Sequence, residues 1–188
     1  MRAFLGIDLD PEVRDDLASL SEALRQSVPG WSGEKWVTAD RLHLTLRFLG
    51  EIDQEMAHDL VARLSVQLRG AEPFVLPCLV PVEPVPGPGR ARMLWTRYED
   101  PDGRCAALAA TVNDVLAEFG IGPEERPFLP HVTLVRTRRP RPFACPAEAS
   151  ATQTCSSMSV GCVTLFSSVL SRSGPHYDRI ARIPLEVR

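Results

Sequence analysis

The chain contains the tetrapeptide His-x-Thr-Leu twice, at residues 43–46 and at residues 131–134. Both copies lie in apolar runs, "RLHLTLRFLG" and "PHVTLVR". In a β-strand alternate side chains share a face, so the histidine and threonine of each copy point one way and the flanking leucine and valine point the other. The sequence therefore predicts two strands that each lay an imidazole and a hydroxyl on one polar face, above an apolar floor.

The two motifs lie almost half the 188-residue chain apart, and the elements expected around them divide into two similar groups. Their order, strands interleaved with single helices and then a closing strand pair, favours an α+β fold with largely antiparallel sheet. We therefore expect two lobes of similar build that face one another. The expected strands cover 1–9, 42–50, 74–82, 92–98, 128–136 and two C-terminal runs, and the expected helices begin near Asp10, Asp53 and Asp100.

Two local expectations accompany this outline. Asp10 precedes Pro11 and an apolar stripe, so its side chain is placed to cap the first helix. The segment 137–154 is basic at its start and rich in proline and alanine, which predicts a loop.

If the polar faces of the two motif strands point inward, two imidazoles and two hydroxyls converge. Imidazole titrates near neutrality, so one histidine can accept a proton while the other donates one. The hydroxyls of Thr45 and Thr133 can donate to phosphate oxygens, and the guanidinium of Arg136 can clamp a phosphate. This set of groups suits phosphodiester chemistry through His43 and His131.

Other interpretations of the histidines are less favoured. His58 lies in the second expected helix and His176 in a turn, and both are expected to be solvated or structural. No HExxH, no His-x-His and no matched carboxylate accompanies the motifs, so no metal site is expected.

The net charge of −3 excludes a general basic field of the kind that holds long nucleic acids. Basic residues do gather in "RTRRPRP" (136–142), directly after the second motif. That run is either a solvated loop or a guide for an RNA backbone. Five cysteines in no CxxC arrangement, with no secretory signal and no membrane-length apolar run, favour reduced thiols and a cytoplasmic location.

The chain resembles the two-histidine (2H) phosphoesterase superfamily and, within it, the RNA 2′,3′-cyclic phosphodiesterase (2′-5′ RNA ligase-like) family. The resemblance runs through nearly the whole length. It is carried by "MRAFLGIDL", "KWVTADRLHLTLRFLGEI", "RMLWTR", "RPFLPHVTLVR" and "LSRSGPHYDRI".

This resemblance implies one bilobal catalytic domain over 1–188, with a motif in each lobe, a central cleft between pseudo-symmetric sheets, and helices outside. It implies that His43 is the proton donor and His131 the proton acceptor, that Thr45 and Thr133 hold the phosphate, and that Arg136 lies beside it. Phe48 is expected either to stack on the base or to be a core aromatic residue.

The expected activity is hydrolysis of RNA 2′,3′-cyclic phosphate ends to 2′-phosphates without a metal or other cofactor. The reverse chemistry would form a 2′-5′ linkage at the same site. The expected partners are RNA ends or nucleotides with a cyclic phosphate, bound by a monomer without an obligate protein partner. The alternatives are a non-catalytic module that binds nucleotides or RNA ends, and a phosphodiesterase acting on 2′-5′ oligonucleotides or a cyclic nucleotide-sugar phosphate.

Overall fold

The structure is a computed structural model that describes residues 1–146, 155–171 and 174–186. In chain order its elements are β1 (Arg2–Asp8), α1 (Pro11–Ser27), β2 (Lys35–Trp36), the 3-10 turn η1 (Ala39–Arg41), β3 (His43–Glu51), α2 (Gln54–Gln67), β4 (Phe74–Leu76), β5 (Cys78–Val85), β6 (Ala91–Tyr98), α3 (Arg104–Glu118), β7 (His131–Arg141), β8 (Met158–Val160), β9 (Cys162–Ser171) and β10 (Gly174–Pro184).

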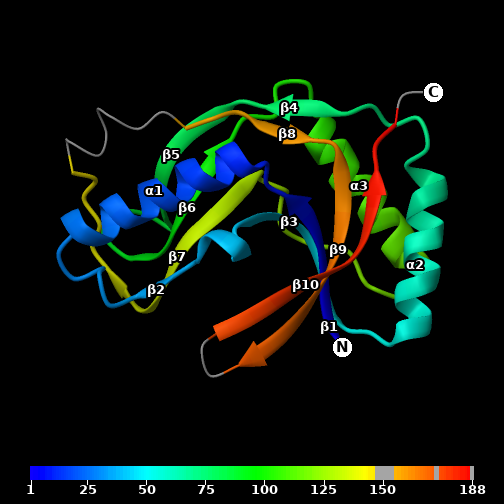
Figure 1. The fold of residues 1–188 in the computed structure, drawn as a ribbon, viewed down its shortest axis with the longest axis horizontal. Coiled ribbons are helices and arrows are strands. Elements are labelled where there is room, and N and C mark those ends of the chain that lie inside the picture. Colours follow the sequence, from blue (N-terminus) through cyan, green and yellow to red (C-terminus); the bar gives the residue numbers. More distant parts are fainter. Residues whose placement is uncertain (147–154, 172–173, 187–188) are drawn as a thin grey trace.

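One curved sheet carries both motif strands at its centre (Figure 1). Its strand order is β10-β9-β1-β3-β7-β6-β5, with β2 paired to β7 beside this path, and the pairings between these strands are antiparallel. The strands from β10 to β3 form one half and those from β7 to β5 the other. The halves meet through one matched residue pair, Leu44 with Val132. The α+β fold expected from the sequence is confirmed, and its two halves share a continuous sheet.

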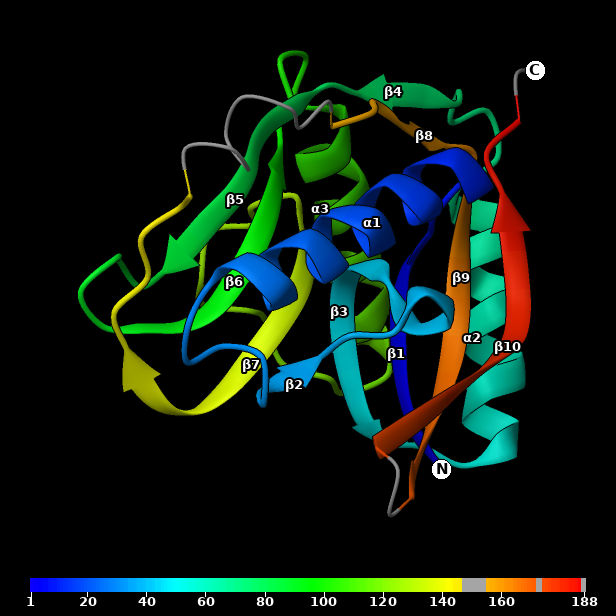
Figure 2. The ribbon, with the colours of Figure 1, turned by 60° about the vertical axis from the view of Figure 1, so that its left-hand side comes forward.

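The helices tie these halves together, as two views of the ribbon show (Figure 1, Figure 2). Helix α1 contacts β7, whereas α3 contacts β3, and α2 contacts α3 and β10. Helix α1 thus precedes β3 in the chain but contacts β7, and helix α3 precedes β7 but contacts β3. The junction residues Leu44 and Val132 are fully buried in the core that these elements share.

Most residues of the stripes predicted from helical spacing are buried as expected, while Met56, Val61 and Phe119 are only partly buried. In α1 the buried stripe residues are Val13, Leu17, Leu20 and Leu24, and in α2 and α3 they include Leu60, Leu64, Leu108, Val112, Val115 and Leu116.

Three local expectations are wrong. The Asp10 carboxylate makes no capping bond within α1, because it accepts instead from the backbone N–H of Ser159 at 3.2 Å. The run 74–82 is two strands separated at Pro77, which has no N–H for a ladder. Residues 137–141 of the expected loop continue β7, because Arg141 still pairs with Ala91 on β6. Residues 147–154 of that segment lie outside the described residues.

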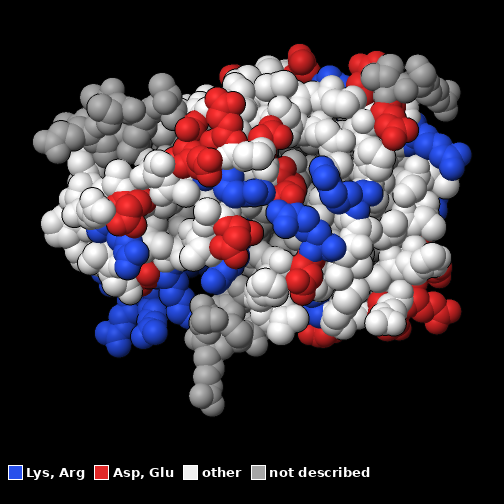
Figure 3. All heavy atoms as spheres, viewed as in Figure 1, with Lys and Arg blue, Asp and Glu red and all other residues white. Residues whose placement is uncertain are grey.

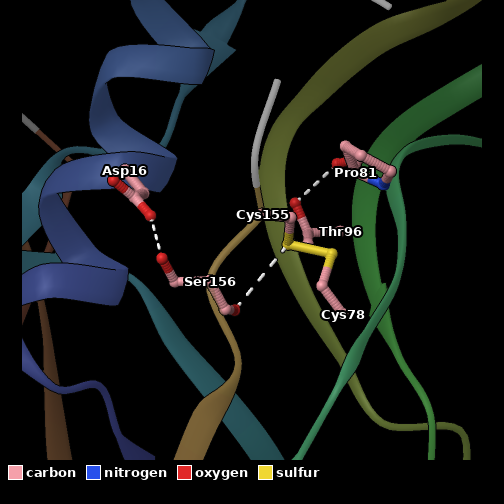
Figure 4. Close-up of a disulfide and its surroundings, with 6 residues drawn as sticks. All are labelled: Asp16, Cys78, Pro81, Thr96, Cys155 and Ser156. Atoms are coloured by element: carbon pink, nitrogen blue, oxygen red, sulfur yellow. Dashed lines mark hydrogen bonds between the residues drawn. A yellow bond between two sulfur atoms is a disulfide. The ribbon is translucent and has the colours of Figure 1, made fainter. Parts of the chain in front are cut away.

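A disulfide joins Cys78 at the start of β5 to Cys155 before β8 (Figure 4). The expectation that all thiols are reduced is therefore wrong: the partners are 77 residues apart, and only the fold brings their Cα atoms to 5.6 Å. Beside the disulfide, the Ser156 hydroxyl bonds the Asp16 carboxylate on α1, so this segment is held from two sides (Figure 4). The remaining thiols are Cys105, Cys145 and Cys162.

None of the helices in the described ranges has the length and apolarity needed to cross a membrane.

Replacement of Cys78 by serine should lower the free energy of unfolding by about 2–4 kcal/mol, because a cross-link over a loop of this length restricts the unfolded chain. Urea denaturation measures the loss. Cys145→Ser, which removes an exposed free thiol, is the matched control and should leave stability unchanged. Equal stability of both variants, or five reactive thiols in the unreduced, denatured wild type, would contradict the bond.

Candidate active site

The two motifs lie side by side in reverse order on neighbouring strands. Because Leu44 is matched with Val132 in an antiparallel pair, the adjoining residues place His43 across from Thr133 and Thr45 across from His131. These four side chains lie on the face opposite the buried pair, and all four are half-buried. The arrangement has an approximate two-fold axis through the junction, so each imidazole has a hydroxyl from the other motif opposite it.

His43 is fixed by its backbone and by aromatic rings. Its Nδ1 lies 2.7 Å from the carbonyl oxygen of Arg41. A carbonyl only accepts, so Nδ1 carries the proton, and in the neutral ring the lone pair is on Nε2. Ring centroids of Phe4, Tyr177 and Phe166 lie 4.6, 5.3 and 5.9 Å from that of the imidazole.

His131 repeats the same backbone contact. Its Nδ1 lies 2.7 Å from the carbonyl oxygen of Leu129, again two residues before the histidine. Its ring stacks on the indole of Trp95, with centroids 3.8 Å apart and an interplanar angle of 22°. Both imidazoles therefore keep Nε2 for proton transfer, while Nδ1 is committed to the backbone.

A β-bulge in each motif strand brings a third residue to the polar face. Opposite β1, Gly6 matches Thr45 but Leu5 matches Arg47, so β3 has one extra residue. Phe48 is thereby matched with Phe4, on the face of His43, although simple alternation would turn it toward the core. Its side chain is 60% exposed, which excludes the alternative that it is a core aromatic residue.

The second strand has the equivalent bulge. Opposite β6, Trp95 matches Thr133 and Leu94 matches Val135, so Arg136 joins the polar face, matched with Met93. Phe48 and Arg136 each follow their histidine by five residues. The two motifs are thus His-x-Thr-x-x-Phe and His-x-Thr-x-x-Arg, and the last position is where the halves differ chemically.

Nearby charges act on both imidazoles. Burial lowers the pKa of His43 and of His131, and the Arg136 guanidinium lowers both further. The charge of a protonated His131 also lowers the pKa of His43, so the two imidazoles and Arg136 act on one another. The Arg136 guanidinium and two imidazoles that can be protonated form an environment suited to an anion.

The halves differ in the residue opposite each histidine. Asp8 is matched with His43 and raises the pKa that burial lowers. Arg97 is matched with His131 and lowers its pKa in addition to burial, while Glu83 raises it. Asp8 is itself held by Arg179 at 2.6 Å, and Arg97 by Glu83 at 3.0 Å.

Several residues of this face were missed by the sequence analysis, namely Phe4, Asp8, Trp95, Arg97, Phe166 and Tyr177. Phe4, Gly6 and Asp8 alternate in the first strand, which was a usable signal for a second polar-facing row. Tyr177 lies on β10, which is separated from β3 in the sheet by β9 and β1. Its ring nevertheless contacts His43, and no local pattern in the sequence indicates this contact.

The other two histidines are exposed, as expected, although His176 lies in a strand and not in the expected turn, because it pairs with Val169. His58 is exposed on α2, and His176 is exposed on β10, 3.1 Å from the carboxylate of Asp178. Within the described ranges, no group of three or more histidine, cysteine or carboxylate side chains is arranged to hold a metal ion.

A family model described as LigT-like phosphoesterase matches residues 7–78 and 99–177. Curated proteins named RNA 2′,3′-cyclic phosphodiesterase are similar to the chain. One from Methanothermobacter thermautotrophicus is 29% identical, covering 94% of this chain and 95% of its own. One from Archaeoglobus fulgidus is 30% identical, and the match covers 94% of this chain and 96% of the relative. One from Escherichia coli is 32% identical, and the match covers 72% of this chain and 71% of the relative.

Solved structures agree with the sequence comparisons. A protein from Thermus thermophilus superposes with a TM-score of 0.79 at 30% identity, covering 100% of this chain and 99% of its own. E. coli LigT complexed with 3′-AMP superposes with a TM-score of 0.70 at 28% identity, and the match covers 98% of this chain and 97% of LigT.

Gly6→Ala should disturb the first motif strand. A Cβ at Gly6 would lie 2.6 Å from the carbonyl oxygen of Leu44, a backbone atom next to the first histidine. We expect a loss of about 1–3 kcal/mol in the free energy of unfolding, as for an overpacked core, measured by urea denaturation. The control is Gly161→Ala, where a Cβ meets nothing within 4 Å. A variant of Gly6 as stable as this control would contradict the close approach.

Both site imidazoles should titrate below 6.5, their ordinary pKa, in the free protein, and a bound anion should raise both values. NMR titration of the ring protons, with and without inorganic phosphate, measures this. Because the unfolded chain then binds more protons just below 6.5, stability should fall as the pH drops through that range, and His43→Gln with His131→Gln should remove that part of the decrease. Titration of either ring above 6.5 would contradict the environment described.

Proposed function

Because the chain belongs to the LigT-like phosphoesterase family, we propose that it is an enzyme that hydrolyses RNA 2′,3′-cyclic phosphodiester ends to 2′-phosphomonoesters. The observation that carries the proposal is the antiparallel junction at Leu44 and Val132, which sets two Nδ1-anchored imidazoles and two hydroxyls on one face. Proteins similar to this chain over most of its length bear the same activity in their names.

In the proposed reaction, Nε2 of His131 takes a proton from water as its oxygen attacks the phosphorus. The bond from phosphorus to the ribose 3′ oxygen breaks, and the Nε2–H of His43 gives that oxygen a proton. The product has a 2′-phosphate and a 3′-hydroxyl; His131 has gained a proton and His43 has lost one, and proton exchange with water restores both. Two histidines are required because one imidazole cannot take and give a proton in the same step.

The charges opposite the two rings support this division of roles. Burial and Arg136 lower both pKa values. Asp8 acts against this at His43 and favours its protonated form, whereas at His131 Arg97 favours the neutral form and its partner Glu83 opposes it. A bound phosphate adds negative charge beside both rings, which favours protonation of the donor. The sequence alone is symmetrical on this point.

The remaining site residues have proposed roles in binding. Thr45 and Thr133 donate to the non-bridging phosphate oxygens, where charge accumulates in the transition state. Arg136, whose guanidinium acts on both imidazoles, binds the same oxygens as a fork. Phe48, largely exposed beside Phe4, offers a ring on which the terminal base stacks.

The same groups run in reverse would join a 5′-hydroxyl to the cyclic phosphate in a 2′-5′ linkage, by microscopic reversibility. A purely binding module is less favoured, because two imidazoles with anchored Nδ1 and available Nε2 serve proton transfer rather than capture. We also propose that the enzyme acts in the cytoplasm, as a monomer without an obligate protein partner. It requires neither a metal nor another cofactor.

His43→Ala and His131→Ala should each reduce kcat on a 2′,3′-cyclic phosphate by about 10²–10⁴-fold, the usual contribution of a positioned acid or base. Product analysis should give the 2′-phosphate, and the wild-type rate should have a bell-shaped pH dependence and survive EDTA.

His58→Ala is the matched control, because His58 is exposed on α2 and should leave kcat unchanged. Wild-type rates in both site variants would refute the two-histidine mechanism. Tight binding of a cyclic nucleotide with no product after long incubation would favour the binding module instead.

A further inference from the structure

Five exposed arginines gather where the end of β7 lies beside the start of β6. None of them forms an ion pair with a carboxylate in the described part of the chain, although nine other arginines do. The five are Arg90, Arg92, Arg136, Arg138 and Arg139. The space-filling view shows Lys and Arg side chains gathered at the lower left, where Figure 1 places the end of β7 (Figure 3).

This group of arginines begins inside the candidate active site. Arg136 lies on the face of His131 and Thr133 because of the bulge in β7. Arg138 and Arg139 follow on the same strand, in the stretch between Arg136, matched with Met93, and Arg141, matched with Ala91, and both side chains are exposed. A row of arginine side chains therefore continues along β7 beyond Thr133, which lies across from His43, and away from the end of the site where Phe48 lies.

The backbone of this row is held in place. The N–H of Arg138 donates to the Glu34 carboxylate at 3.3 Å, and the Thr137 hydroxyl donates to the carbonyl of Arg139 at 2.9 Å. Arg141, by contrast, is itself paired with Glu34. The side chains of Arg138 and Arg139 are thus presented by a fixed strand, and the solvated-loop alternative for "RTRRPRP" is less favoured.

The flank of the site beside His43 has a different character. The guanidinium of Arg179 on this flank is neutralised by Asp8, at 2.6 and 2.9 Å. The other groups packed around the His43 ring are aromatic. In the described part of the chain, Arg136, Arg138 and Arg139 on β7 therefore differ from Arg179 in that no carboxylate pairs with them.

We propose that Arg138 and Arg139 bind backbone phosphates upstream of the cyclic end, so that an RNA strand is a better substrate than a mononucleotide. The inference rests on the proposed function. A 2′,3′-cyclic phosphate is always the 3′ end of its strand, so the rest of the strand leaves the site in the 5′ direction. With the base on the Phe48 side, the upstream phosphates follow the flank that carries the row of unpaired arginines.

The test compares two substrates, a short oligoribonucleotide with a 2′,3′-cyclic phosphate end and a nucleoside 2′,3′-cyclic phosphate. The variant is the double substitution Arg138→Gln and Arg139→Gln. Its kcat/KM on the oligonucleotide should fall about 10-fold, and the slope of log kcat/KM against log salt should become shallower by about 1.4, as expected for two lost single-strand phosphate contacts. On the nucleoside cyclic phosphate, kcat/KM should stay unchanged.

The matched control is Arg69→Gln, which removes one exposed arginine just beyond α2, at the far side of the molecule from β7 (Figure 1). This control should leave kcat/KM unchanged on both substrates. Equal wild-type kcat/KM on both substrates, equal losses on both in the double variant, or no loss on the oligonucleotide would each overturn the inference. If the wild type turns over neither substrate, the proposed function itself fails, and that result is distinct from these three.

Discussion

The antiparallel contact of β3 with β7 at Leu44 and Val132 is the constraint on which the site depends. This buried pair fixes the register of two strands that are distant in sequence, and so fixes which histidine faces which threonine. A slip of one residue would turn every imidazole and hydroxyl to the wrong face. The apolar floor therefore does more than stabilise the sheet, because it also determines the geometry of the groups above it.

Two β-bulges extend this geometry beyond the motifs. Each inserts one residue after the threonine and reverses the alternation, so the position five residues after each histidine reaches the polar face. One half of the molecule places Phe48 there and the other places Arg136. A nearly symmetrical pair of strands thus presents an aromatic ring on one side and a guanidinium on the other, the two groups to which binding roles are proposed above.

The same asymmetry continues outward from the centre. Around His43 the neighbours are aromatic rings and a carboxylate that neutralises its arginine partner. Around His131 the neighbours are an indole and arginines, and beyond them β7 continues with exposed arginines. This difference in charge is the basis for proposing distinct acid and base roles for two residues that make identical backbone contacts, and for the proposed path of an RNA strand.

The sequence by itself determined the two motif strands and the inward faces of the helices, because strand and helix periodicity are local properties. It also singled out four candidate site residues on those strands, His43, Thr45, His131 and Thr133. Only the tertiary structure decided that Phe48 is exposed on the site face, since a bulge depends on how a neighbouring strand pairs. It also decided that Tyr177 contacts His43 and that Cys78 meets Cys155. Such contacts arise from the packing of elements far apart in the chain, for which no periodic pattern exists.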